Sequence, residues 1–112
     1  MTTILPTDAN DNVIPALRLK MDGAQSIPVT SALSTRNAIG FSTDTRVISV
    51  YATGPVYLRF GELDAVAAST DHYFPEGVYY DFAVGGNGVD HTPYLAVIAA
   101  DTDCNLYISE KD

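Results

Sequence analysis

Hydrophobic and polar positions alternate with a period of two along most of the chain, the spacing that predicts β-strands rather than helices. Segments that show this alternation, or a run of β-branched and aromatic residues, are 16–20, 25–30, 37–41, 45–53, 56–60, 78–84, 94–100 and 104–110. In 56–60, Val56, Leu58 and Phe60 are expected to face a core, while Tyr57 and Arg59 point outward. The pattern therefore predicts about eight strands.

Local residues refine the placement of these strands. Gly54-Pro55 separates 45–53 from 56–60 and predicts that the two segments pair as a hairpin. The segment 94–100 is apolar on both faces, which is typical of a strand in the middle of a sheet. Pro28 cannot donate a backbone hydrogen bond, so its strand is expected at a sheet edge.

The segment 61–70 leaves two alternatives open. Leu63, Val66 and Ala67 have helical spacing, yet no cap follows them and strands lie on either side. A short helix and an extended excursion are both compatible with this stretch. Because no other helix and no internal repeat is indicated, the predicted fold class is all-β. We expect an antiparallel β-sandwich of two sheets with jelly-roll or Greek-key topology.

A tight turn is predicted before the strand at 78–84. Pro75 supplies the preset φ that a type I turn favours, and Gly77 can adopt a positive φ without steric cost. Glu76 then lies at the exposed tip of this turn. A catalytic acid needs burial or a nearby like charge to raise its pKa, so Glu76 is interpreted as a turn residue.

Length and charge limit the classes of partner. The 112 residues predict one sandwich domain, 13–112, preceded by a flexible N-terminal arm, 1–12, that is rich in turn formers. Fourteen acidic and six scattered basic residues give a net charge of −8, which argues against nucleic acid as a partner. The opening residues do not resemble a signal peptide, and no apolar run is long enough for a membrane span.

Few residues carry candidate chemistry. Cys104 is the one cysteine, which excludes an intrachain disulfide and is typical of a small buried hydrophobe. The oxygen-rich stretch 8–12 imitates the start of a calcium loop. Val13 and Leu19, however, replace the Gly and Glu that an EF-hand requires. A turn is the better interpretation of 8–12, although weak calcium binding stays open.

Two histidines each follow an aspartate, in Asp71-His72 and Asp90-His91. These four side chains could hold a transition metal only if the fold brought them together, and chance adjacency in an acidic chain explains them more simply. Asp101 and Asp103 are expected in a turn. No nucleophile or phosphate-binding motif is present. We therefore predict a non-enzymatic protein with no catalytic residues, no metal site and no cofactor.

Tyrosine is the abundant aromatic residue, with seven copies and no tryptophan. Tyr57, Tyr79 and Tyr107 alternate with the inward residues of their strands, so they are expected to be exposed and are candidate interface residues. Exposed tyrosines can anchor a protein interface or stack on sugar rings. Because tryptophan is absent, a subunit interface is the preferred interpretation, and cover by the domain itself is the simplest alternative.

Residues 46–109 resemble small β-sandwich proteins encoded among bacteriophage and prophage structural genes. The shared landmarks are Gly54-Pro55, Arg59-Phe60-Gly61, the Ala/Thr-rich stretch 65–71, Pro75-Glu76-Gly77 and Leu106-Tyr107-Ile108. The resemblance implies a capsid-decorating, head-associated or tail-associated protein, and it brings no catalytic residues.

Two functional hypotheses follow. The first is a virion structural protein that associates with itself and with a capsid or tail protein, located in the virion or, before assembly, in the bacterial cytoplasm. The second is a carbohydrate- or ligand-binding sandwich, assisted by calcium at Asp8, Asp101 or Asp103.

Overall fold

The computed structural model describes residues 10, 19–86, 88 and 90–111, and these form eight β-strands without a helix. The strands are β1 (Leu19–Val29), β2 (Thr35–Arg36), β3 (Val47–Ala52), β4 (Val56–Gly61), β5 (His72–Phe74), β6 (Tyr79–Ala83), β7 (Tyr94–Ala99) and β8 (Cys104–Lys111). Most of the predicted arm, 1–12, lies outside the described residues. None of the described segments is a helix that could cross a membrane.

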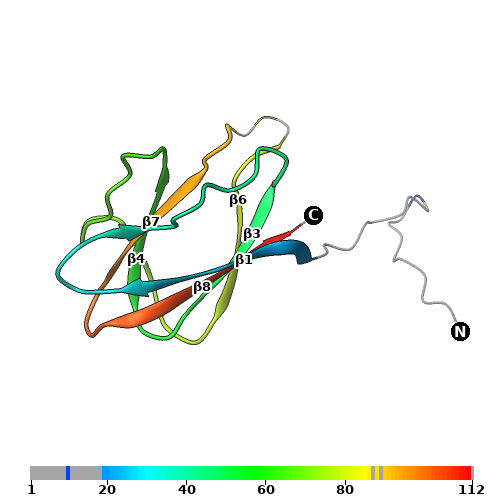
Figure 1. Ribbon diagram of the computed structural model, residues 1–112. Coiled ribbons are helices and arrows are strands. Elements are labelled where there is room, and N and C mark those ends of the chain that lie inside the picture. Colours follow the sequence, from blue (N-terminus) through cyan, green and yellow to red (C-terminus); the bar gives the residue numbers. More distant parts are fainter. Residues whose placement is uncertain (1–9, 11–18, 87, 89, 112) are drawn as a thin grey trace, which may run out of the picture.

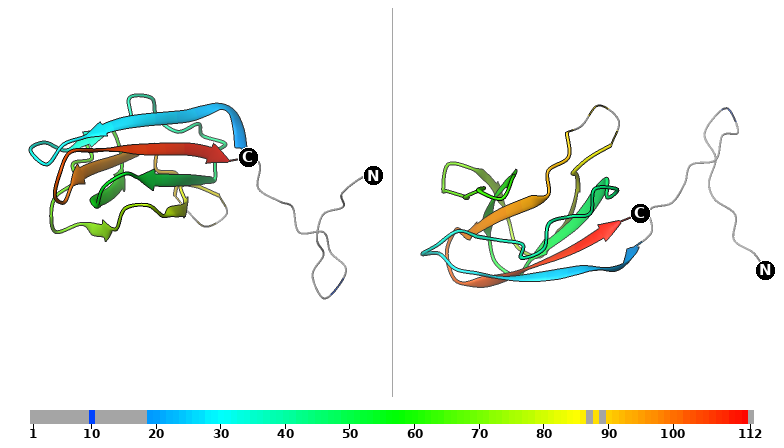
Figure 2. Two further views of the ribbon diagram at one scale, coloured as in Figure 1. Left: turned by 90° about the horizontal axis from the view of Figure 1, so that it is seen from below. Right: turned by 45° about the horizontal axis from the view of Figure 1, so that its top comes forward.

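The eight strands form two four-stranded antiparallel sheets packed as a sandwich (Figure 1). Sheet one has the order β1-β8-β3-β6, and its strands lie side by side in the left view of Figure 2. Sheet two has the order β2-β7-β4-β5. Strand pairs β1–β8, β2–β7, β3–β6 and β4–β5 are the nested pairs of a jelly roll. The predicted all-β sandwich is confirmed.

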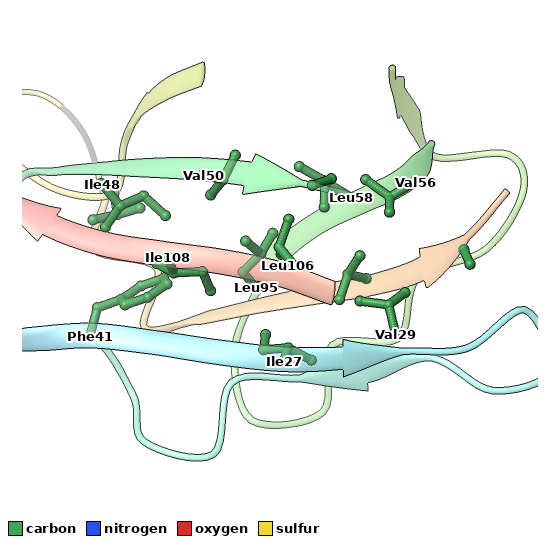
Figure 3. Packing of buried hydrophobic residues seen from close by; sticks show 14 residues of the cluster. Ile27, Val29, Phe41, Ile48, Val50, Val56, Leu58, Leu95, Leu106 and Ile108 are labelled. Carbon is green, nitrogen blue, oxygen red and sulfur yellow. The ribbon is translucent and has the colours of Figure 1, made fainter. Parts of the chain in front are cut away.

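One hydrophobic core fills the space between the sheets (Figure 3). Both sheets contribute fully buried aliphatic side chains: Ile48, Leu106 and Ile108 from sheet one, and Leu58 and Leu95 from sheet two. Burying each of these side chains stabilises the fold by roughly 1.5–3 kcal/mol. The inward positions predicted for Val56, Leu58 and Phe60 on β4 are confirmed.

The predicted hairpin at Gly54-Pro55 is wrong, because β3 and β4 belong to different sheets. The chain crosses from sheet one to sheet two at this point. The crossing passes close to Cys104, and a Cβ added at Gly54 would lie 3.0 Å from the Cys104 Cβ. A small residue is needed here for the close approach of two chain segments, so the Gly-Pro signal marks a sheet crossing.

The predicted strand at 37–41 is also wrong, since the short strand β2 ends at Arg36. Asn37 is fully buried, and its side chain replaces backbone pairing. Its Oδ1 accepts the Leu95 amide at 2.8 Å, and its Nδ2 donates to the carbonyls of Ile39 and Pro93. These bonds hold the segment against the start of β7 without a strand ladder.

The first two predicted strands are parts of one strand, because β1 runs continuously from Leu19, in the described end of 16–20, to Val29, one residue short of the end of 25–30. Its pairing with β8 is irregular between Leu19 and Ala24, where Asp22 has a φ of 62°. Such a bulge increases local twist and does not end the strand. Pro28 lies on this outer strand of sheet one, so the predicted edge position is confirmed.

The open question at 61–70 is answered by an extended connection with turns, since no helix forms there. The connection leads into β5, a strand that the hydrophobic pattern did not predict. Phe74 of β5 packs edge-on against Tyr80 and Phe82 of β6, with ring centroids 5.0 and 5.3 Å apart. These aromatic contacts close one side of the core, whereas Val78, just before β6, is exposed.

Candidate functional site

Two of the three candidate tyrosines lie in one row across the outer face of sheet one. Tyr79 of β6 and Tyr107 of β8 are both register partners of Tyr51 on β3. The Tyr51 and Tyr79 rings are 4.8 Å apart, and Tyr79 is 70% exposed. Directly paired residues of antiparallel strands project from the same face, so the three tyrosines form one aromatic row.

We call this outer surface the tyrosine face. It comprises the outward residues of four strands: Leu19, Ala24, Ser26 and Pro28 on β1, Asn105, Tyr107, Ser109 and Lys111 on β8, Val47, Ser49 and Tyr51 on β3, and Tyr79, Asp81 and Ala83 on β6. Leu19 and Tyr79, at opposite corners, are its most exposed large apolar side chains. The face is thus apolar and hydroxyl-rich.

A polar row runs beside the tyrosines. The Ser49 hydroxyl donates to the Asp81 carboxylate, and Lys111 Nζ lies 3.2 Å from Asp81 Oδ1. The hydrogen bond from Ser49 has the largest effect, followed by that from Lys111, and both lower the pKa of Asp81 from its usual value. Asp81 is therefore ionised at neutral pH and balances the charge of Lys111.

The polar row forms the floor of a shallow hollow with a volume of about 360 Å³. Its lining residues are Leu19, Ser49, Tyr79, Asp81, Ser109 and Lys111. The hollow presents an exposed aromatic ring beside hydroxyl, carboxylate and ammonium groups. It can therefore exchange hydrogen bonds with a neutral polar ligand and pack against the apolar face of that ligand.

The third candidate, Tyr57, lies on the other side of the sandwich. It projects from the outer face of sheet two, where it pairs with Tyr73 at a ring distance of 5.6 Å. The structure therefore does not bring Tyr57 together with Tyr79 and Tyr107. Sequence alternation could place each tyrosine on an outward face, but assigning strands to sheets requires the topology.

The outer face of sheet two is partly covered by the chain itself. The segment 62–68 lies over it, because Arg36 Nε donates to the Leu63 carbonyl at 2.8 Å and the Ala67 amide donates to Ser34 Oγ at 2.8 Å. Ala96, on the outward side of β7, is consequently fully buried. Cover by the domain itself is the alternative to an interface for the outward tyrosines, and such cover is present on sheet two.

The two Asp-His pairs have separate structural roles. Asp71 accepts the Ala68 amide at 2.8 Å and Arg59 Nη1 at 2.9 Å, and these contacts lower its pKa. His72 is exposed on β5, whereas His91 Nε2 lies 3.3 Å from the Phe41 carbonyl oxygen. Among the described residues, no three His, Cys, Asp or Glu side chains gather as a metal site would require.

The remaining sequence candidates lie in loops or at the margin of the core. Asp103 accepts the Ser31 amide at 3.2 Å, Asp101 is exposed, and Asp8 lies outside the described residues. Cys104 is half-buried against the core, and this burial raises the pKa of its thiol. Glu76 is exposed next to Gly77, whose φ of 80° confirms the predicted left-handed turn position.

A scan against protein-family models, a search of curated proteins and a search of solved structures found no match to this chain. The comparisons thus add no family to the β-sandwich fold, and the phage resemblance stays a prediction. The tyrosine face, built from β1, β8, β3 and β6, is the candidate functional site.

Proposed function

We propose that this protein is a non-enzymatic structural component of a phage or prophage virion. It acts as a capsid- or tail-associated protein that binds copies of itself or a virion lattice through the tyrosine face. The observation that carries the proposal is the open outer face of sheet one, with Tyr79 and Tyr107 exposed on it. Tyrosine is enriched in the cores of protein interfaces and among the residues that dominate binding energy.

Two further observations support the proposal. The sequence resemblance to phage structural proteins covers residues 46–109, which contain all of β3 to β7 and most of β8. The jelly roll is also an architecture of viral capsid domains. Fold alone does not imply function, so the proposal depends on the surface and not on the topology.

The proposal is tested with particles of the phage or prophage encoded in the same source DNA. We expect mass spectrometry of purified particles to detect this protein, and we expect the recombinant protein to co-sediment with particles that lack it. Tyr79→Glu places a charge in the aromatic row and should reduce co-sedimentation at least tenfold. Tyr73→Glu is the matched control, because Tyr73 is 55% exposed on the opposite sheet. Absence from the particles together with no co-sedimentation would contradict the proposal.

The hollow beside Tyr79 favours a second candidate function, the binding of a neutral carbohydrate. Its aromatic ring can stack on the apolar side of a sugar ring, and Asp81, Lys111 and the serines can bond to hydroxyl groups. Calcium assistance gains no support from Asp103, whose carboxylate already accepts the Ser31 amide.

A thermal-shift assay tests this second candidate, because a ligand that binds only the native state raises its melting temperature. We expect a neutral glycan to raise the melting temperature of the wild type and of Tyr73→Ala, but not of Tyr79→Ala. A glycan panel that leaves the melting temperature of the wild type unchanged would contradict carbohydrate binding. Parallel titration with calcium examines the metal-assisted version.

A further inference from the structure

Charge singles out the tyrosine face among the surfaces that two copies of this acidic chain could bring together. The chain carries a net charge of −8, so most pairs of surfaces repel each other. On the tyrosine face the charged side chains are Asp81 and Lys111, which are 3.2 Å apart and sum to zero. The whole acidic excess therefore lies elsewhere, and net charge does not oppose the pairing of two copies through this face.

The sheet edges are poorly suited to pairing between copies. In sheet one, β1 carries Pro28 and the irregular stretch around Asp22, and both disfavour an added strand. The opposite edge, β6, is short and has Asp81 at its centre. A symmetric antiparallel pair of two β6 strands would place two Asp81 carboxylates opposite each other. In sheet two, the edge strands β2 and β5 have only two and three residues.

The outer face of sheet two is not equivalent to the tyrosine face. The segment 62–68 lies over it, and both Ala67 in this segment and Ala96 on β7 are buried. No described segment lies over sheet one in this way, since Leu19, Tyr79 and Tyr107 remain exposed. Among the described residues, the tyrosine face is therefore the sheet face left open for another molecule.

We propose that the tyrosine face docks onto the tyrosine face of a second copy of this chain, in a two-fold face-to-face pair. This inference rests on the proposed function, because it names the partner that the face binds. In a two-fold pair each contact occurs twice. Asp81 of each copy can therefore form an ion pair with Lys111 of the other copy, while the tyrosine rows provide apolar contact. The inner face of sheet one takes no part in this pairing, because it packs in the core.

The size of the face sets the expected affinity. Four strands spaced about 4.8 Å apart give a face roughly 19 Å wide. Strands β3 and β6 have six and five residues, so at about 3.3 Å per residue the face is roughly 20 Å long. Its flat area of about 400 Å² is below the roughly 800 Å² per partner of a standard stable interface. We therefore expect a pair with a dissociation constant in the micromolar range, which becomes persistent only when many copies are held on one lattice.

Sedimentation-velocity ultracentrifugation from micromolar to millimolar protein tests the inference. The wild type should pass from monomer to dimer, and Tyr79→Glu should raise the dissociation constant at least tenfold. Tyr73→Glu introduces the same charge on the opposite sheet and should leave the dimer unchanged. Circular dichroism melts verify that the variants are folded. Tyr107→Ala, which alters a different strand of the face, gives a second readout if Tyr79→Glu fails to fold.

Three results would overturn the inference. The first is a wild type that stays monomeric at all concentrations. The second is a dimer that tolerates both Tyr79→Glu and Tyr107→Ala. The third is a dimer that is weakened equally by Tyr73→Glu. Co-sedimentation with particles separates these results from the proposed function: a monomer that still binds particles through Tyr79 has a virion protein as its partner on this face. A monomer that does not bind particles contradicts both proposals.

Discussion

Glu110 is a buried carboxylate that neighbouring uncharged donors hold in the core of the sandwich. The Thr45 hydroxyl donates to Glu110 Oε1 at 2.7 Å, and the Ser42 amide donates to the same oxygen at 3.1 Å. These bonds fix the segment before β3 against the end of β8. Continuing the alternation of Leu106 and Ile108 would have predicted an inward Glu110, but its partners could not be predicted because they are distant in the sequence.

Gly77 has a backbone conformation that restricts substitution. Its φ is 80°, and its amide donates to the Ala52 carbonyl at 3.0 Å. Gly77→Val should lower the free energy of unfolding by about 1–3 kcal/mol, because a β-branched residue is strained in this region. Urea denaturation measures the change. Glu76→Val, in the same turn without a positive φ, is the control and should shift stability by no more than about 0.5 kcal/mol.

At the scale of elements, local pattern predicts strands well but does not predict how they are joined. The inward residues of β4 and β8 follow directly from alternation, and the apolar run at 94–100 correctly indicates the central strand β7. The pairing of β3 with β8 depends instead on contacts across half of the chain. Gly54-Pro55 looks the same in sequence whether the chain returns in one sheet or crosses to the other.

For the candidate site too, local pattern predicts which side chains point outward but not which of them lie together. Outward tyrosines could be predicted from the strand pattern, whereas the separation of Tyr57 from Tyr79 and Tyr107 could not. Tyr51 pairs with Tyr79 and Tyr73 pairs with Tyr57 across strands, and nothing in the local pattern distinguishes these two partners from other tyrosines. Cross-strand neighbours come from strands that are distant in the chain, and no local signal encodes them.

The segment that follows β2 gives a prediction at the scale of elements. Asn37→Ala removes the side chain that bonds to the Leu95 amide and to two carbonyls. Leaving a buried polar group unsatisfied costs about 1–3 kcal/mol, so the free energy of unfolding should fall by at least about 1 kcal/mol. Hydrogen exchange should also accelerate at the Leu95 amide. Asn105→Ala, at an exposed position, is the matched control, and an equal loss in both variants would contradict this role for Asn37.

At the scale of the whole molecule, ion pairs connect segments that are far apart in the chain. Lys20 contacts Asp44 at 2.7 Å, and its hydrogen bond, with that of Ser42, lowers the pKa of Asp44 to about 2. Asp81 and Asp71 also have lowered pKa values. Each pair bridges different strands or loops, so the three contacts depend on the folded topology.

The lowered pKa values predict how stability depends on pH. A carboxylate with a depressed folded-state pKa stabilises the fold above its unfolded pKa of about 3.9, and this contribution is lost as the pH falls through the folded value. We expect the contribution of Asp44 to be constant at neutral pH and to decline between about pH 4 and pH 2. Urea denaturation at each pH measures it. Asp44→Asn should flatten the slope in this window, and an unchanged slope would contradict the pairing with Lys20.

The position of β8 has a consequence for synthesis of the protein on the ribosome. This strand, which begins at Cys104, follows the other seven described strands in the chain, yet it lies between β1 and β3 in sheet one. Until β8 emerges from the exit tunnel, β1 has no neighbour in its sheet and β3 has only β6. Sandwiches with such non-local pairing fold in milliseconds to seconds. Sheet one therefore cannot be completed before β8 has been synthesised and is outside the tunnel, and until then the unpaired β1 and β3 are exposed to aggregation and proteolysis.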